Sequence, residues 1–192
     1  MIEDLILIIS PIIAIIALGI SYYLYVTTKR NLMYQVIVEL QMEYRKPEMQ
    51  YALWILWGLY DEVNEDEEAL MKKYGEKYYE EKKILQKVQE NYYKKTKMHG
   101  KPQEKPIETL KTTLDHQRRL VSQYYHHLAV LTVNNIVPKN TIYKIWDEEA
   151  LKIIPEILIP MHQKLLEIHH KEPKDKEYSD MRQLYIDSKD YK

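Results

Sequence analysis

The feature that most constrains this chain is an uncharged run of 22 residues near its start, Leu5 to Val26, which reads LILIISPIIAIIALGISYYLYV. A helix rises about 1.5 Å per residue, so a run of this length can cross a hydrocarbon core of about 30 Å. The next apolar stretch, Ala52 to Tyr60, is too short to do so. The sequence therefore predicts one transmembrane helix, with residues 1–29 as the anchor.

A secretory signal peptide is the alternative interpretation of this run. Such a signal carries basic residues before its apolar segment and small residues at a cleavage site after it. Here Glu3 and Asp4 precede the run, and no small-x-small site follows it. These features favour an anchor that is retained in membrane lipid.

The residues that flank the run predict its orientation. Basic residues near a span stay on the cytoplasmic side, and amphipathic rings prefer the headgroup layer. Two acidic residues precede the run, whereas Lys29, Arg30, Arg45 and Lys46 follow it. We therefore expect a single-pass protein of the cell membrane, with its N-terminus outside and its C-terminal domain in the cytoplasm. The predicted membrane-interface anchors are Tyr22, Tyr23, Tyr25, Lys29 and Arg30.

Composition favours an all-α fold for the whole chain. The 192 residues include four Gly and no Cys, which excludes disulfides and argues against glycine-rich phosphate loops and turn-dense β-sandwiches. No segment shows sustained alternation of apolar and polar residues, as a half-buried strand would. We expect a cytoplasmic helical bundle over residues 30–172, followed by a polar tail over residues 173–192 with a short helix around Asp180 to Ile186.

Two helices are predicted directly after the anchor. Met33, Ile37, Leu40 and Tyr44 form one apolar stripe, and Pro47 marks the boundary at which a second helix begins. This second helix has one apolar face with Leu53 and Leu56, and another with Trp54 and Trp57. A helix that is apolar on two faces is expected to be buried, although the Trp face could instead contact a partner or the bilayer surface. After the acidic run Asp61 to Glu68, in which Asn64 and Glu67 resemble a capping box, a long helix is predicted.

Two heptad seams predict a long antiparallel helical hairpin of the coiled-coil type. The first seam is Met71, Tyr74, Tyr78, Glu81, Leu85, Val88 and Tyr92, and the second is Leu110, Leu114, Gln117, Val121, Tyr124, Leu128 and Leu131. Folding the chain near residue 101 pairs the two seams from Met71 with Leu131 to Tyr92 with Leu110, including Tyr74 with Leu128 and Glu81 with Val121.

The second arm is expected to end at Asn134 and Asn135, before Pro138. Asp147 is a candidate cap for a later helix, whose apolar seam is Leu151, Ile154, Leu158, Met161, Leu165 and Ile168. Pro155 and Pro160 remove backbone donors there, so a bend between them is expected.

Two segments, TTKRNLMYQVIVELQMEYRKPEMQYALWILW and QRRLVSQYYHHLAVLTVNNIV, resemble an uncharacterised family of small membrane-anchored helical proteins, defined by a domain of unknown function. In the second segment Arg118 and Arg119 precede an aromatic residue, here Tyr125 where the family tends to carry Phe. A late helix ending near Pro160 is also similar, and the resemblance covers most of residues 28–187. It implies an architecture and brings no activity.

Candidate contact residues for a partner or ligand gather in the second segment: Arg118, Arg119, Tyr125, His126 and His127. Adjacent arginines on a helix point about 100° apart, so we expect one to pair with a carboxylate inside the bundle and the other to reach solvent. The alternative is that this basic patch binds a small anionic ligand.

Other chemistries find less support. A di-metal bundle needs two Glu-x-x-His motifs, and only Glu167 with His170 matches, so no metal or other cofactor is expected. The serines lack the strand-to-helix turn of a hydrolase nucleophile, and we expect no enzyme. The segment from Ala69 to Lys105 contains eleven Lys and only five Glu, with tyrosines between them. This pattern fits a solvated helix whose tyrosines point inward better than it fits a nucleic-acid groove or a lipid-binding surface.

The sequence thus favours a single-pass membrane-anchored interaction or scaffolding protein, an accessory subunit of a membrane complex, with a protein partner or a second copy of itself. The alternative is a membrane-tethered sensor that binds a small anionic ligand or nucleic acid through the basic patch. A concave basic pocket would indicate the sensor, and an exposed apolar face would indicate the scaffold.

Overall fold

The computed structural model describes residues 2–99, 111–172 and 178–191, and every regular element in these ranges is a helix. The chain divides into two compact units, Met1–Met42 and Glu43–Lys192. The second unit is called the helical body. The all-α fold class is confirmed for the described ranges.

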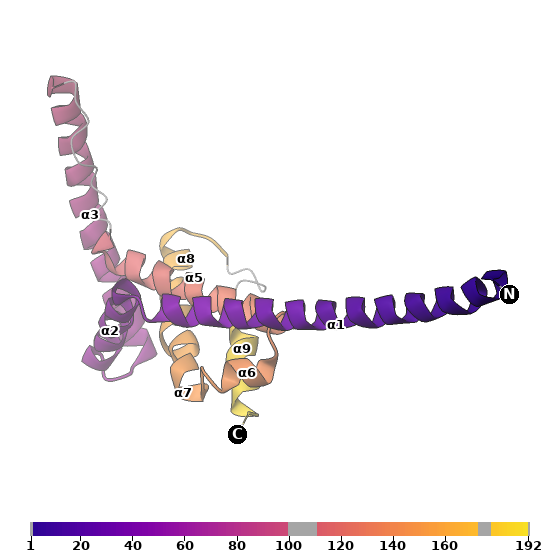
Figure 1. Cartoon of the computed structure of the whole chain (residues 1–192). Helices are drawn as coiled ribbons and strands as arrows, with labels where there is room; N and C mark the ends of the chain where they lie inside the picture. The colour runs from indigo at the N-terminus through magenta and orange to yellow at the C-terminus, as the bar shows by residue number, and fades with distance from the viewer. Residues whose placement is uncertain (1, 100–110, 173–177, 192) are drawn as a thin grey trace. The chain divides into compact units, whose positions relative to one another are not determined.

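The first unit is formed by one helix, α1, which runs without interruption over Ile2–Tyr44, so that its last two residues belong to the second unit (Figure 1). From Ile12 onward it is long and apolar enough to cross a membrane, and none of its most apolar stretch is buried. Both a membrane span and a signal anchor have this length and composition. Beyond the apolar run the predicted stripe is partly confirmed, since Ile37 and Leu40 are buried.

Helix α2, Pro47–Glu62, begins at the predicted proline, which suits the first turn because it lacks the N–H that would have no partner there. Leu53 and Leu56 are buried, as expected for a core face. The expectation that both faces are buried is wrong, because Trp54 remains 69% exposed and its ring lies 6.0 Å from that of exposed Tyr51, centroid to centroid.

The capping box predicted for Asn64 and Glu67 is wrong, as the turn before α3, Glu67–His99, shows. Asn64 and Glu65 have positive φ angles of 54° and 59°, which reverse the chain direction. The cap is therefore Asp66, whose Oδ1 accepts a hydrogen bond from the Ala69 N–H at 2.6 Å. A side-chain oxygen at this position satisfies a donor that the helix leaves unpaired.

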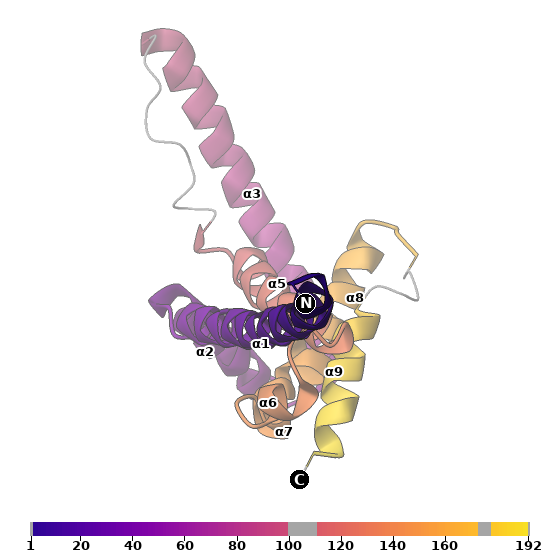
Figure 2. The same ribbon diagram turned by 45° about the vertical axis from the view of Figure 1, so that its right-hand side comes forward.

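Helix α5, Leu114–Val133, is the central helix of the body and packs against α2 and against α9, Ser179–Lys189. Its end at the C-cap Asn134 and the left-handed Asn135 confirms the predicted stop. Helix α9 buries Met181 and Leu184. Since α9 packs against α5 and against α7, Glu148–Leu151 (Figure 2), the C-terminal segment, expected to be mainly a polar tail, contributes to the core through this helix.

The predicted hairpin register is wrong for the described pairs. Helix α3 packs mainly against α8, Ile159–Ile168, and meets α5 only near the first turn of α5. The Tyr74 hydroxyl bonds Asp115 at 2.9 Å rather than lying beside Leu128, and Glu81 bonds the Leu114 N–H rather than packing on Val121. The tip near residue 101 and the pair Tyr92 with Leu110 lie outside the described residues or side chains.

Two short helices, α6 (Lys139–Tyr143) and α7 (Glu148–Leu151), lead into the last part of the body. Asp147 caps α7 as predicted, since its side chain accepts a bond from the Ala150 N–H. Between Pro155 and Pro160, where a bend is expected, the chain forms a π-helix, Ile154–Leu158, directly before α8. Proline removes an N–H from the regular ladder, which explains the wider turn.

Candidate functional site

The candidate site lies where α3 meets the first turn of α5. Two side chains, those of Thr113 and Glu81, accept hydrogen bonds from backbone N–H groups at the N-terminus of α5. Thr113 precedes α5, and its hydroxyl accepts a hydrogen bond from the His116 N–H at 3.2 Å. The carboxylate of Glu81, which comes from α3, accepts from the Leu114 N–H at 2.8 and 3.0 Å. An acidic group at a helix N-terminus also interacts favourably with the helix dipole. Glu81, the polar interruption of the first seam, therefore joins α3 to α5.

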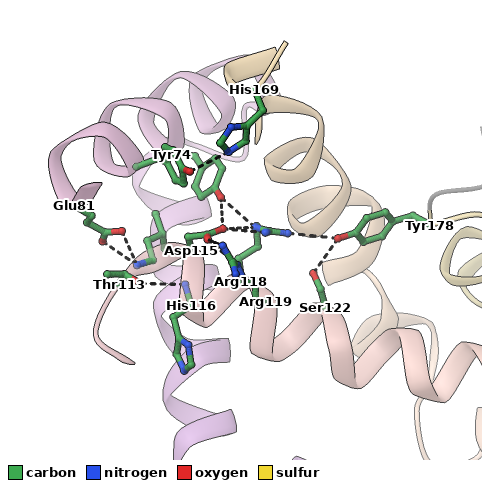
Figure 3. A network of polar contacts seen from close by, with 12 residues as sticks. Tyr74, Glu81, Thr113, Asp115, His116, Arg118, Arg119, Ser122, His169 and Tyr178 are labelled. Carbon is green, nitrogen blue, oxygen red and sulfur yellow. Dashed lines mark hydrogen bonds and ion pairs between the residues drawn. The ribbon is translucent and has the colours of Figure 1, made fainter. Parts of the chain in front are cut away.

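Asp115 is the centre of a buried network beside this cap (Figure 3). Its Oδ1 accepts hydrogen bonds from the Tyr74 hydroxyl at 2.9 Å and from Arg118 Nε and Nη2 at 3.1 and 2.9 Å. Its Oδ2 accepts a hydrogen bond from Arg119 Nε at 2.8 Å and forms an ion pair with Arg119 Nη2 at 2.7 Å. One carboxylate thus accepts hydrogen bonds from two guanidinium groups and one phenol.

The two arginines differ in their exposure, as expected from their angular separation. The Arg118 side chain is 5% exposed, whereas the Arg119 side chain is 62% exposed. Arg118 also donates from Nη1 to the Tyr178 hydroxyl at 3.4 Å, which connects the network to the residue that precedes α9. The buried arginine therefore ties together α3, α5 and the start of the C-terminal helix.

Protonation in the network follows from burial and from these charges. Burial acts to raise the pKa of Asp115, but the charge and hydrogen bonds of Arg118 outweigh it and hold that pKa below its usual value. Burial raises the pKa of Tyr74, only partly opposed by Arg118. Burial also raises the pKa of Glu81 despite its bonds to backbone N–H groups. The Asp115 carboxylate is accordingly held in its charged form.

A cavity of about 170 Å³ opens beside the network, on the side of exposed Arg119. It is lined by Tyr78, Glu81, Lys82, Leu85, Thr113, Asp115, His116 and Arg119. The lining carries both signs of charge, and the Tyr78 hydroxyl lies 3.0 Å from His169 Nε2 of the turn after α8. The cavity therefore carries mixed charge and is not the concave basic pocket that would indicate a sensor.

The five predicted contact residues do not converge. Of these, only Arg119 lines the cavity. Arg118 lies inside the network, and Tyr125 is buried with its hydroxyl donating to the Ala150 carbonyl at 2.9 Å. His126 and His127 are exposed on α5, about 10 Å further along the helix axis from Arg119.

Sequence reasoning missed Tyr74, Asp115 and Glu81 as members of the site. The spacing of Asp115 to Arg118 and Arg119, three and four residues along one helix, was a signal that could have identified the carboxylate partner.

Within the described residues no group of three or more His, Asp or Glu side chains is arranged to hold a metal ion. Glu167, one half of the single Glu-x-x-His match, pairs with Lys164 at 2.7 Å, and His170 lies in an exposed turn with a positive φ of 53°.

The predicted interface anchors all lie on α1. Tyr22, Tyr23 and Tyr25 are among its exposed large side chains, and Lys29 and Arg30 are exposed as well.

The chain matches no protein-family model, no curated protein sequence and no solved structure. The family resemblance of its two segments stays a prediction.

Proposed function

We propose that this protein is a single-pass membrane-anchored interaction protein whose helical body lies in the cytoplasm and serves as an accessory subunit of a membrane complex. The observation that carries the proposal is apolar surface left exposed on two helices. The apolar run of α1 is unburied, and α2 exposes Tyr51 and Trp54 beside a fully buried opposite face. Exposed apolar surface of this kind is typical of interaction sites.

The polar groups of the body support an interaction role rather than an enzymatic one. The buried charged groups, Asp115 and Arg118, form an ion pair with one another and hydrogen bonds with Tyr74 inside the body. Groups bound in this way orient helices and are not positioned to exchange protons with a substrate. We therefore propose no catalytic activity.

The orientation follows from the flanking charges. Basic residues concentrate after the apolar run at Lys29, Arg30, Arg45 and Lys46, and such residues stay on the cytoplasmic side. Lipid contacts would then involve the tyrosines at the end of the run.

Copurification from membranes tests the interaction role. The full chain is extracted in mild detergent, and its stoichiometric companions are identified and quantified for the wild type, Trp54→Ala and Ile84→Ala. Ile84 is exposed on α3 and provides a matched control. We expect a companion that is lost with Trp54→Ala and kept with Ile84→Ala, while both variants unfold as the wild type does. A chain without any stoichiometric companion or second copy would contradict the proposal.

A second candidate, a membrane-tethered sensor, rests on the cavity beside Arg119. Its lining could hold a small ligand with an anionic group near Arg119 and Lys82. Citrate, phosphate and dicarboxylic amino acids are suitable probes for calorimetry on the full chain. Saturable binding that is lost in Arg119→Ala would favour the sensor over the interaction protein.

A further inference from the structure

The part of α1 that follows the apolar run exposes a second apolar stripe. Tyr34, Val38 and Met42 are each more than half exposed, whereas Ile37 and Leu40 are buried. At about 100° per residue, Val38 and Met42 lie roughly opposite the buried pair, whereas Tyr34 is only about 60° from Ile37.

Val38 and Met42 belong to a continuous heptad series, whereas Tyr34 lies beside it. From Met42 back toward the N-terminus, positions alternate four and three residues apart: Met42, Val38, Gln35, Asn31, Thr28, Leu24, Ser21, Ala17 and Ala14. Every one of these side chains is exposed. A strict heptad series on a long helix drifts about 20° per heptad and is matched by a partner helix in a left-handed supercoil.

The residue types of the series differ between the apolar run, the end of that run and the helix beyond it. In the apolar run, where most residues are Ile, Leu or Tyr, the series includes three of the four small residues from Ile12 to Val26, and small residues let transmembrane helices approach closely. Thr28, Asn31 and Gln35 follow at the end of the run, and Val38 and Met42 complete the series. The apolar positions outside the run show that the surface does not serve lipid contact alone.

The length and direction of the series define what can cover it. Residues 27–44 extend about 27 Å along the helix axis beyond Val26. The occupant must therefore be a helix that leaves the membrane in the same direction and continues for a similar distance. A second copy of this chain meets both requirements, because all copies insert with the same orientation.

In a parallel pair of copies, each position of the heptad series also meets a residue of the same kind. Around a twofold axis each residue of the seam meets its own counterpart, so small residues face small ones, polar residues face polar ones, and Val38 and Met42 face apolar ones. Polar layers in such seams fix the register of the two helices.

We propose that α1 pairs in parallel with α1 of a second copy through the heptad seam that runs from Ala14 to Met42. This pairing rests on the proposed membrane insertion of α1 and identifies one partner of the interaction protein as the chain itself.

The absence of Cys from the sequence makes cross-linking a direct test. Single cysteines are introduced into the full chain in native membranes at seam positions, as Thr28→Cys, Asn31→Cys and Val38→Cys. The matched controls are Val26→Cys, Met33→Cys and Val36→Cys, which lie off the seam at similar depths and carry no charge that sets the orientation. A disulfide between identical positions requires Cβ atoms about 3.8 Å apart, so we expect on the order of fivefold more disulfide dimer at seam positions under mild oxidation.

Three outcomes would overturn the pairing: a flat profile across all positions, a maximum on the face of Ile37 and Leu40, or disulfides only to other proteins. Alkaline extraction of the same membranes separates this failure from failure of the proposed function. Chain that stays in the membrane pellet with a flat profile refutes the pairing alone, whereas chain in the aqueous fraction refutes the anchored protein itself.

Discussion

Helices α5 and α1 differ in how many of their side chains are buried within this chain. More than half of the residues of α5 are buried, and its buried charges Asp115 and Arg118 have partners within the body. Helix α1 is more than twice as long, yet Ile37 and Leu40 are its only buried residues among the described side chains. Contacts inside this chain thus explain most of the sequence of α5, whereas they explain little of the sequence of α1 among its described side chains.

The largest expected effect comes from breaking the buried network of α5. Arg118→Ala removes the main partner of buried Asp115, and we expect a loss of about 3–5 kcal/mol in the free energy of unfolding because a buried charge loses its main partner. Denaturant unfolding of the full chain in detergent, followed by circular dichroism, measures it.

Arg119→Ala is the matched control, since this arginine bonds the same carboxylate from an exposed position. An exposed ion pair contributes about 0–1 kcal/mol, so the expected loss is small. Equal losses in the two variants would show that Asp115 does not depend on the buried partner.

A smaller effect compares apolar side chains on the two helices. Leu128→Ala empties a fully buried position of α5 and should cost about 2–5 kcal/mol. Met42→Ala on the exposed face of α1 should change the stability of detergent-dispersed monomer by about 0.5 kcal/mol or less. A comparable loss in both variants would mean that the exposed face of α1 is covered from within the chain.

The sequence predicted the elements that depend on local signals. The apolar run, the helix start at Pro47, the cap at Asp147 and the stop at Asn134 each follow from chemistry within a few residues. Of the seam predicted on α3, Tyr74 is buried, whereas Met71 and Tyr78 are half-buried.

The pairing of α3 with α5 could not be predicted from the heptad pattern, because polar bonds decide it. Glu81 and Tyr74 reach the first turn of α5, and these bonds set the crossing point of the two helices. A seam pattern identifies which face of a helix is apolar but not which helix covers that face. The exposure of Trp54 was missed for the same reason.

The smallest expected effect is a dependence of stability on pH. The pKa of Glu81 is raised above its ordinary value of 4.5, so the folded protein holds this proton more tightly than the unfolded chain does. Stability should therefore fall as pH rises from about 4.5 through the folded pKa, and Glu81→Gln should remove that fall. Glu80→Gln, at an exposed neighbouring position, should keep it.

Asp115 contributes the opposite sign in the same titration. Its pKa is lowered, so its stabilising effect is present above the ordinary value of 3.8 and is lost as pH falls through the folded pKa. Unfolding measured across this range should show a loss toward acid pH that Asp115→Asn lacks. A loss that persists unchanged in this variant would assign it to another carboxylate.

The central claim, that α1 holds the body at the cytoplasmic face of a membrane, is tested most directly by labelling single cysteines in intact cells. The chain has no Cys of its own, so Glu3→Cys and Glu80→Cys report on the two sides without background. A membrane-impermeant maleimide should label position 3 in intact cells and position 80 only after lysis. Labelling of position 80 in intact cells, or recovery of the chain in the aqueous fraction, would contradict the account.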